Sequence, residues 1–323
     1  FPPDLSSRPD DIYYVLHSIS FQNNFKWEHL NYQYLNSAME SFHFFYIIPS
    51  AISLYVLGDY YTSMAAGNII VTCIVAICAN SILKEQGYKW HQVFSLILLL
   101  FPDLLGFSTA TAGKDTWVLL SHVVFIKAMS SYLVNKNSRF IFYLLLAAII
   151  SINLRFYIPV IFAFIILARL KITIYYILLV LILSFFILYF TEIYQNLNSL
   201  LNTGLANISS DLLPSLIAIP YGMLHFLLTP LPWQISLTHS YLLLPSIIYL
   251  MLLPMFILGL VNGALDQKNK FKRFIFFYIL IFFIIYGYID FLQGPRHRYQ
   301  LDFGILYFIF IGFKSIKFAE KSS

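Results

Sequence analysis

Charged residues are scarce in this sequence. Asp, Glu, Lys and Arg make up 11% of the 323 residues, whereas a soluble protein has about a quarter. Hydrophobic residues make up 59% and aromatic residues 19%. A water-soluble fold needs a polar covering, and so few charged side chains cannot supply one. The composition therefore excludes an ordinary soluble globular protein.

Cysteine and the common catalytic motifs are also rare or absent. Cys73 and Cys78 lie in one apolar stretch, and five residues apart on a helix they point about 140° away from each other. This spacing excludes a disulfide or a metal pair between them, so we expect two small apolar core residues. The sequence contains no nucleotide phosphate loop, no His/Cys metal set and no Ser nucleophile elbow. It also shows no internal repeat and no soluble domain.

Long apolar runs are what the sequence does contain. Spanning a bilayer takes about 20 apolar residues in a helix, and these runs lack the period-2 alternation of outer-membrane strands. We therefore predict an all-α fold, a polytopic transmembrane helical bundle with about 9–11 membrane segments, some of them broken or re-entrant. The apolar segments are 42–57, 62–83, 92–109, 116–134, 139–154, 156–170, 171–190, 214–230, 239–265, 273–292 and 300–316.

Proline interrupts several of these segments, which predicts kinks or half-helices. The prolines concerned are Pro49, Pro102, Pro159, Pro220 and Pro254. A further stretch, Thr229–Trp233, combines two prolines with a Trp and predicts a stiff turn at the membrane interface.

Residues 1–41 are the most polar part of the chain. Tyr, Trp and Phe beside polar groups favour helices that lie in the membrane interface. We therefore divide the chain into an interfacial region, 1–41, and a transmembrane helical domain, 42–323. The sequence begins with Phe rather than Met, and whether a membrane helix precedes residue 1 is left open.

Basic residues predict how the chain is oriented, because cytoplasmic loops carry an excess of Lys and Arg. For the same reason the net charge of +5 is no signal of nucleic-acid binding. The basic groups expected in the cytoplasm are Lys136 with Arg139, Arg169 with Lys171, Lys268 to Arg273, and Lys314 to Lys321. The opposite face then holds 113–115, Arg155 and 296–298, three polar sites far apart in sequence that converge on one side.

The location of residues 1–41 depends on the number of crossings. If every apolar segment spans, residues 1–41 are cytoplasmic. If one segment is re-entrant, such as the one that Pro102 breaks, they lie outside with the three polar sites. We favour the outside.

The strongest polar cluster is Arg296-His297-Arg298. Arg binds a phosphate through two parallel hydrogen bonds, which Lys cannot do. The cluster therefore predicts a phosphate or pyrophosphate site. The alternative is an anchor in the membrane interface, with Asp290 and Asp302 as the partners of the cations.

Two further cationic positions predict the same chemistry. Lys114 and Asp115 open an apolar segment, where the amides of a helix N-terminus and an ammonium group together attract an anion. A capping Asp and a snorkelling Lys are the alternative reading. Arg155 lies between two short apolar runs, where it either lines a polar cavity that holds a phosphate or anchors the interface.

Asp10 and Asp11 precede Tyr13 and Tyr14 in the interfacial region. A carboxylate at the membrane surface can act as general base toward a hydroxyl group. The alternative is a helix N-cap. The same pair is the one place where a divalent cation could be held beside a lipid phosphate, and the sequence leaves the metal requirement open.

In these motifs the chain resembles the GT-C superfamily of membrane glycosyltransferases, especially the protein O-mannosyltransferases and aminoarabinose transferases. That family has an acidic motif followed by Tyr in its first external loop, which residues 10–14 resemble. Asp115 is similar to its acidic residue at the start of a later helix, and 296–299 to its Arg-x-Arg-Tyr pattern before a final span. Residues 1–323 differ from the family's pattern in two ways, because they include neither the helix that precedes the acidic motif in the family nor the large soluble C-terminal domain of some members.

The resemblance implies an inverting transfer of a sugar from a polyprenyl-phosphate donor to a glycan, lipid or protein acceptor. The enzyme would lie in the bacterial inner membrane, among membrane lipids, with its active site on the extracytoplasmic face. Asp10 or Asp11 would take the acceptor's proton. The lipid-phosphate site would comprise Lys114, Asp115, Arg155, Arg296, His297 and Arg298, because cations stabilise the negative charge that develops on the leaving phosphate.

Three alternatives to this function stay open. An O-antigen-type polysaccharide polymerase similarly combines many spans with external Arg residues, without needing the early acidic base. A lipid or solute transporter would use the charged residues to line a path. A structural subunit of a larger membrane complex is the third.

Overall fold

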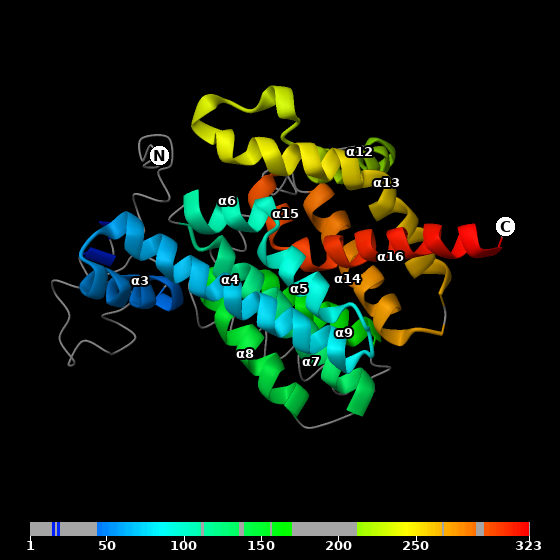
Figure 1. Ribbon diagram of the computed structural model, residues 1–323, viewed down its shortest axis with the longest axis horizontal. Helices are drawn as coiled ribbons and strands as arrows, with labels where there is room; N and C mark the ends of the chain where they lie inside the picture. Colours follow the sequence, from blue (N-terminus) through cyan, green and yellow to red (C-terminus); the bar gives the residue numbers. More distant parts are fainter. Residues whose placement is uncertain are drawn as a thin grey trace.

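The described part of the chain is mostly helical. The computed structural model describes residues 15–16, 18–19, 44–110, 113–135, 139–155, 157–169, 212–266, 268–288 and 294–322. Within these ranges there are helices and no strands, which confirms the predicted all-α fold (Figure 1). The α-helices are α3 (Phe44–Leu57), α4 (Tyr60–Glu85), α5 (His91–Leu99), α6 (Pro102–Ala110), α7 (Asp115–Asn135), α8 (Arg139–Leu154), α9 (Tyr157–Arg169), α12 (Leu212–Leu228), α13 (Leu243–Leu265), α14 (Lys270–Tyr288), α15 (Pro295–Tyr299) and α16 (Asp302–Ser322).

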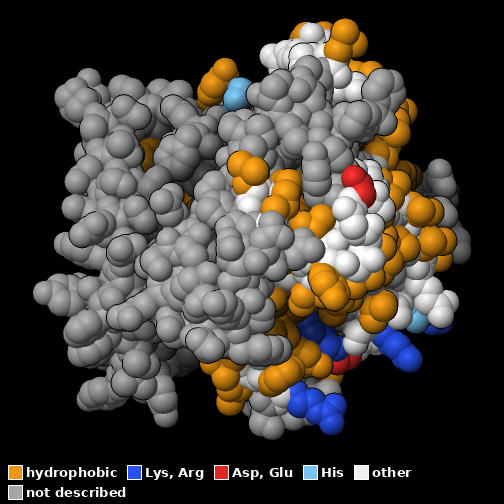
Figure 2. Space-filling view, turned by 90° about the vertical axis from the view of Figure 1, so that its left-hand side faces the viewer, with side chains coloured by type: hydrophobic (Ala, Val, Ile, Leu, Met, Phe, Trp, Pro, Cys, Tyr) orange, Lys and Arg blue, Asp and Glu red, His pale blue; other side chains and the backbone are white. Residues whose placement is uncertain are grey.

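Four of the described helices are long and apolar enough to cross a membrane, and a bent pair makes a possible fifth crossing. The four are Thr62–Glu85, Asp115–Val134, His239–Leu265 and Lys270–Tyr288. Large apolar side chains are exposed on the outside of the helices, such as Met251 of α13, 72% exposed, and Phe142 of the shorter helix α8, 64% exposed. On the described part of the face in Figure 2 most side chains are likewise hydrophobic. The chain is therefore an integral membrane protein.

The helices match the apolar segments that the sequence predicts. Each predicted segment corresponds to one helix or helix pair, except 171–190, which lies outside the described residues. Almost all of the interfacial region 1–41 lies outside them too. Pro49, Pro220 and Pro254 lie inside helices. Pro102 begins α6 after a bend of 44° from α5, in agreement with the predicted broken segment.

Local sequence sets the bounds of α4. The Asp59 side chain accepts a hydrogen bond of 2.8 Å from the Thr62 amide and so satisfies a donor that the helix leaves free. At the other end, Gly87 adopts φ +74°, a conformation that ends helices and that glycine adopts without strain. The 26 residues between reach about 39 Å, enough to cross a bilayer. Cys73 is exposed on this helix, so the expectation that it is a core residue is wrong.

Small residues bring α13 and α16 into close contact. A Cβ atom placed on Gly259 would lie 1.8 Å from the backbone oxygen of Phe308, and one on Gly312 would lie 2.0 Å from that of Met255. Gly263, one turn after Gly259, faces the Phe308 ring. Glycines four residues apart allow this approach between membrane helices. The pair α13–α16 therefore forms a fixed unit that positions the N-terminus of α16.

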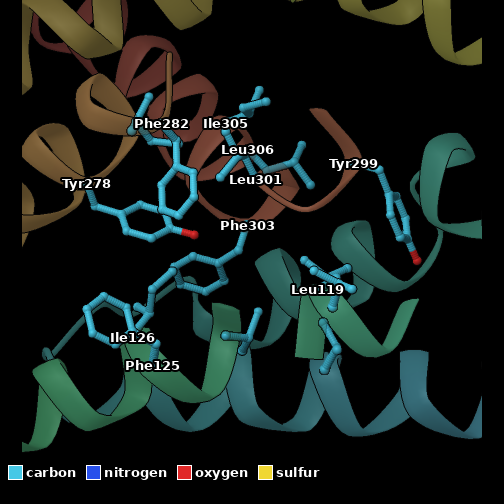
Figure 3. Packing of buried hydrophobic residues seen from close by; sticks show 14 of the residues in the cluster. Leu119, Phe125, Ile126, Tyr278, Phe282, Tyr299, Leu301, Phe303, Ile305 and Leu306 are labelled. Carbon is cyan, nitrogen blue, oxygen red and sulfur yellow. The ribbon is translucent and has the colours of Figure 1, made fainter. Parts of the chain in front are cut away.

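Aromatic side chains fill the space between α7, α14 and α16 (Figure 3). Phe125 of α7 stacks on Phe162 of α9 with ring centroids 4.0 Å apart, and Tyr278 of α14 packs beside both Phe125 and Phe282. The rings fix these helices against each other. As a result the start of α7, the α8–α9 junction and α15 lie at one end of the bundle.

Candidate functional site

Asp115 joins two distant arginines at that end of the bundle. Its Oδ1 accepts a hydrogen bond of 2.7 Å from Nη2 of Arg155, and its Oδ2 accepts one of 2.8 Å from Nε of Arg296. Only 3% of the Asp115 side chain is exposed, against 10% for Arg155 and 37% for Arg296. One carboxylate at the start of α7 thus holds two guanidinium groups, and Arg296 keeps a partly exposed side.

The break between α8 and α9 positions Arg155. The Arg155 amide donates to the Ser151 carbonyl, which completes α8, and the Ile158 amide donates to the Arg155 carbonyl at the start of α9. The Arg155 side chain is then free to point across to Asp115, and its Nη1 also donates to the Tyr157 hydroxyl at 2.9 Å. The predicted junction between two short apolar runs therefore serves to place one cation.

His297 acts as a partner of Arg155. Its Nε2 is hydrogen-bonded to Nη1 of Arg155. Burial, together with the positive charge of Arg155, holds the pKa of His297 well below its usual value. His297 is therefore neutral at pH 7 and accepts this hydrogen bond, which orients the guanidinium without adding a further positive charge to the cluster.

Lys114 belongs to the same group of charges. It is 9% exposed and lies just before α7, and its backbone oxygen accepts from the amides of Trp117 and Val118. The charges of Lys114, Asp115, Arg155 and Arg296 all act on His297, so these side chains lie near it. We call these five residues the Asp115 cluster. These five residues carry three positive charges, on Lys114, Arg155 and Arg296, and one negative charge, on Asp115.

Arg298 faces a different cluster, although it is only two residues from Arg296. Two residues on a helix correspond to about 200°, so the two side chains leave α15 on opposite sides. Arg298 is fully buried, and its Nη1 donates to the carbonyl oxygens of Leu227 and Thr229 at 2.9 and 3.1 Å. Its Nε lies 3.8 Å from Oδ2 of Asp103 on α6.

Two more helices, α13 and α16, contribute side chains around Arg298. The guanidinium carbon lies 4.1 Å from the ring centroid of Tyr249 on α13, a cation–π contact. The Tyr249 hydroxyl donates to Oδ1 of Asp302, the first residue of α16. We call Asp103, Tyr249, Arg298 and Asp302 the Arg298 cluster.

The structure therefore separates the predicted site residues into two groups. Lys114, Asp115, Arg155, Arg296 and His297 come together in the Asp115 cluster, whereas Arg298 lies in the Arg298 cluster. Asp10 and Asp11, the predicted general bases, lie outside the described residues, as does Asp290. Among the described residues no group of three or more His, Cys, Asp or Glu side chains is placed to hold a metal ion.

Sequence reasoning missed Asp103 and Tyr249. Asp103 follows Pro102 in an apolar segment, and an acidic residue at membrane depth is a signal of function or of a buried ion pair. That signal could have found Asp103. Nothing in the local sequence distinguishes Tyr249 from the many other tyrosines.

Comparison of the chain with known protein families, with curated proteins and with solved structures found no match.

Proposed function

We propose that the protein is a membrane glycosyltransferase of the GT-C type that takes a sugar from a polyprenyl-phosphate donor. The observation that carries this proposal is the excess of cations in the Asp115 cluster. Arg155 and Arg296 both form ion pairs with the Asp115 carboxylate, and the charge of Lys114, which is 9% exposed, acts on His297 beside them. An excess of buried positive charge is costly, and a bound anion offsets that cost.

A phosphate monoester or diester fits this arrangement. Arginine binds phosphate oxygens through parallel N–H donors, and Arg155 Nε has no hydrogen-bond partner within the described structure. The 37% exposed side of Arg296 offers access from outside the bundle. The apolar outer faces of the neighbouring helices suit a polyprenyl chain that lies in the bilayer.

The reaction we propose is an inverting displacement at the anomeric carbon of the donor sugar. The acceptor oxygen forms the new bond to that carbon, while the bond from the carbon to the phosphate oxygen breaks. Asp10 or Asp11 takes the proton of the acceptor hydroxyl. The departing polyprenyl phosphate keeps the electron pair, and Lys114, Arg155 and Arg296 stabilise its negative charge.

The proposal extends to the setting of the enzyme. We expect about 9–11 membrane segments in the whole chain, in the bacterial inner membrane, with the Asp115 cluster on the extracytoplasmic face. The acceptor is a glycan, a lipid or a protein. If the reaction uses a divalent cation, Asp10 and Asp11 are the residues that would hold it, and it would neutralise charge on the lipid phosphate.

The first test is binding of polyprenyl phosphate to the purified protein in detergent. Wild type is compared with Arg155→Gln, which removes a charge from the cluster. The matched control is Arg273→Gln, which removes an exposed charge in the first turn of α14. We expect binding to fall at least tenfold in Arg155→Gln and to stay unchanged in the control. Equal binding by all three proteins would refute the phosphate site.

The polysaccharide polymerase remains the second candidate, because the same cations would hold a pyrophosphate-linked lipid. The two differ in their need for an acidic base. If Asp10→Asn and Asp11→Asn both leave the turnover of a lipid-linked sugar intact, the polymerase is favoured. Loss of turnover with lipid binding retained in either variant supports the glycosyltransferase. Transport of the lipid without cleavage of the sugar would favour a transporter over both.

A further inference from the structure

The Arg298 cluster carries more negative than positive charge. Asp103 and Asp302 are each fully buried, and so is Arg298, whose Nε lies 3.8 Å from Asp103 Oδ2 and whose charge acts on Asp302. The Asp103 carboxyl acts electrostatically on the Asp302 carboxyl, so the two belong to one site. If both carboxyls were ionised, the cluster would hold one uncompensated negative charge out of contact with water. An unpaired buried charge of this kind is strongly destabilising.

Several polar atoms in this cluster have no hydrogen-bond partner. Both oxygens of Asp103 and Oδ2 of Asp302 are buried without one, and so are Nε and Nη2 of Arg298. Buried polar atoms are nearly always paired, and each exception needs an explanation. An ionised carboxylate can only accept hydrogen bonds, whereas a protonated carboxyl also donates one. A missing positive species beside the carboxyl oxygens accounts for the orphan acceptors and for the charge together.

Further ionisable groups around the carboxyls do not change this balance. Tyr249 faces both, and it donates its hydroxyl to Asp302. Tyr299 of α15 acts on both electrostatically, and its hydroxyl donates to Thr116 at 3.2 Å. A phenol is a far weaker acid than a carboxyl group, so both tyrosines stay neutral at pH 7. Among the described residues Arg298 is then the one charge that opposes the two carboxyls.

We propose that Asp103 and Asp302 together hold one proton at neutral pH, so that the Arg298 cluster is a proton-binding site inside the membrane domain. Protonation of either carboxyl leaves one carboxylate opposite one guanidinium, which is the neutral arrangement. The site is chemically distinct from the Asp115 cluster, where the excess charge is positive and an anion is needed.

A proton fits this site better than a metal cation. Hard cations take six or more oxygen ligands, and the carbonyl oxygens of Leu227 and Thr229 already accept from Arg298. The guanidinium that touches Asp103 would also repel a metal ion. A proton needs one oxygen and no coordination shell.

Infrared spectroscopy of the purified protein tests the proposal directly. A protonated carboxyl has a carbonyl stretching band that an ionised carboxylate lacks. Wild type is compared at pH 7 with Asp103→Asn and with Asp302→Asn, each of which leaves one carboxylate opposite Arg298. The control is Asp266→Asn, which removes a carboxylate paired with Lys272 at the α13–α14 loop. We expect a protonated-carboxyl band in wild type and in the control, and its loss in both cluster variants.

Three results in these spectra would contradict the proposal. No such band in wild type at pH 7 refutes it even if neither variant folds. A band that persists undiminished in both cluster variants assigns the proton elsewhere. A band that appears only when sodium is replaced by choline identifies a sodium ion as the occupant. If the Asn variants do not fold, Asp302→Glu keeps the acid, and a shift of the band in that variant supports the proposal.

Discussion

Oδ1 of Asp115 accepts a hydrogen bond of 2.7 Å from Nη2 of Arg155, forty residues further along the chain. Both side chains are at least nine-tenths excluded from solvent. The contact ties the start of α7 to the α8–α9 junction, and the second oxygen of Asp115 extends the tie to Arg296 on α15. Loss of this one carboxylate should therefore affect three parts of the fold together.

We expect Asp115→Asn to destabilise the protein strongly. The substitution leaves the Arg155 guanidinium buried without a countercharge, and removing one partner of a buried pair costs about 3–5 kcal/mol. Thermal unfolding of the detergent-solubilised protein measures the loss. Asp59→Asn is the control, because Asp59 caps α4 at an exposed site and Asn caps a helix about as well. Equal stability of the two variants would show that the Asp115 contacts contribute little.

The two arginines should differ in their effect. Arg296 is 37% exposed and Arg155 is 10% exposed, so water compensates the loss of contacts better at Arg296. We expect Arg296→Ala to cost about 1 kcal/mol or less and Arg155→Ala to cost clearly more, in the same unfolding measurement. The reverse order would contradict this reading of the cluster.

Stability should fall below neutral pH because of His297. Burial and the charge of Arg155 lower the pKa of His297 in the folded protein. The folded state therefore does not bind the proton that His297 binds in the unfolded chain, near the ordinary pKa of about 6.5. Stability from this group is fully present above that pH and declines as the pH falls, by at most about 1.4 kcal/mol per unit. His297→Gln, which keeps a hydrogen-bond acceptor, should flatten the decline between about pH 6.5 and pH 5. Identical slopes for wild type and variant would assign the effect to other groups.

Close packing of α13 and α16 predicts a contrast between two glycines. Gly259→Ala would place a Cβ atom 1.8 Å from the Phe308 oxygen, and overpacking of this kind costs about 1–3 kcal/mol. Gly67→Ala meets only Ser53 Oγ at 3.8 Å, an ordinary contact, and should stabilise α4 by about 0.5–1 kcal/mol because alanine favours a helix. The melting temperatures should therefore move in opposite directions. A neutral Gly259→Ala would show that the two helices can separate without cost.

Much of the fold could be predicted from the sequence, because membrane segments are defined by local composition. The apolar runs gave the helices, and Pro102 marked the bend between α5 and α6. The alternation of basic loops placed 113–115, Arg155 and 296–298 on one side, and these segments make contact in the structure. The partners themselves could not be predicted in this way. Among the described residues the α15 arginines form ion pairs with Asp115 and Asp103, whereas the nearest described acid in sequence is Asp302.

The division of 296–298 into two clusters needed three-dimensional information. A run of Arg-His-Arg predicts one cationic patch if it lies in an open turn. In the structure the run forms a short helix, α15, so its first and third side chains point in opposite directions. The burial of His297 between Arg155 and the Tyr286 ring then makes it neutral. Neither effect has a signature in the sequence, because both depend on which helices surround α15.

Lys127, further along α7, forms another ion pair. It allows a test of how much a buried charge costs when its partner is removed. Nζ of Lys127 donates to Oε1 of Glu85 and, at 2.7 Å, to the Ser81 hydroxyl, both on α4. Its side chain is 8% exposed, whereas that of Glu85 is 31% exposed. Glu85→Gln should therefore cost more than Lys127→Met, because it leaves the more deeply buried charge unpaired, by roughly 2–3 kcal/mol.

The double variant Glu85→Gln/Lys127→Met should be more stable than Glu85→Gln alone. Replacing both charges removes the pair together with its desolvation cost. The effect of the double variant on the free energy of unfolding should therefore differ from the sum of the two single effects by about 0.5–3 kcal/mol. Unfolding of the four proteins of this cycle, in one detergent at one pH, gives the coupling energy. Additive effects would mean that water reaches Lys127 once Glu85 is neutral, and that the α4–α7 interface tolerates a lone cation at this depth.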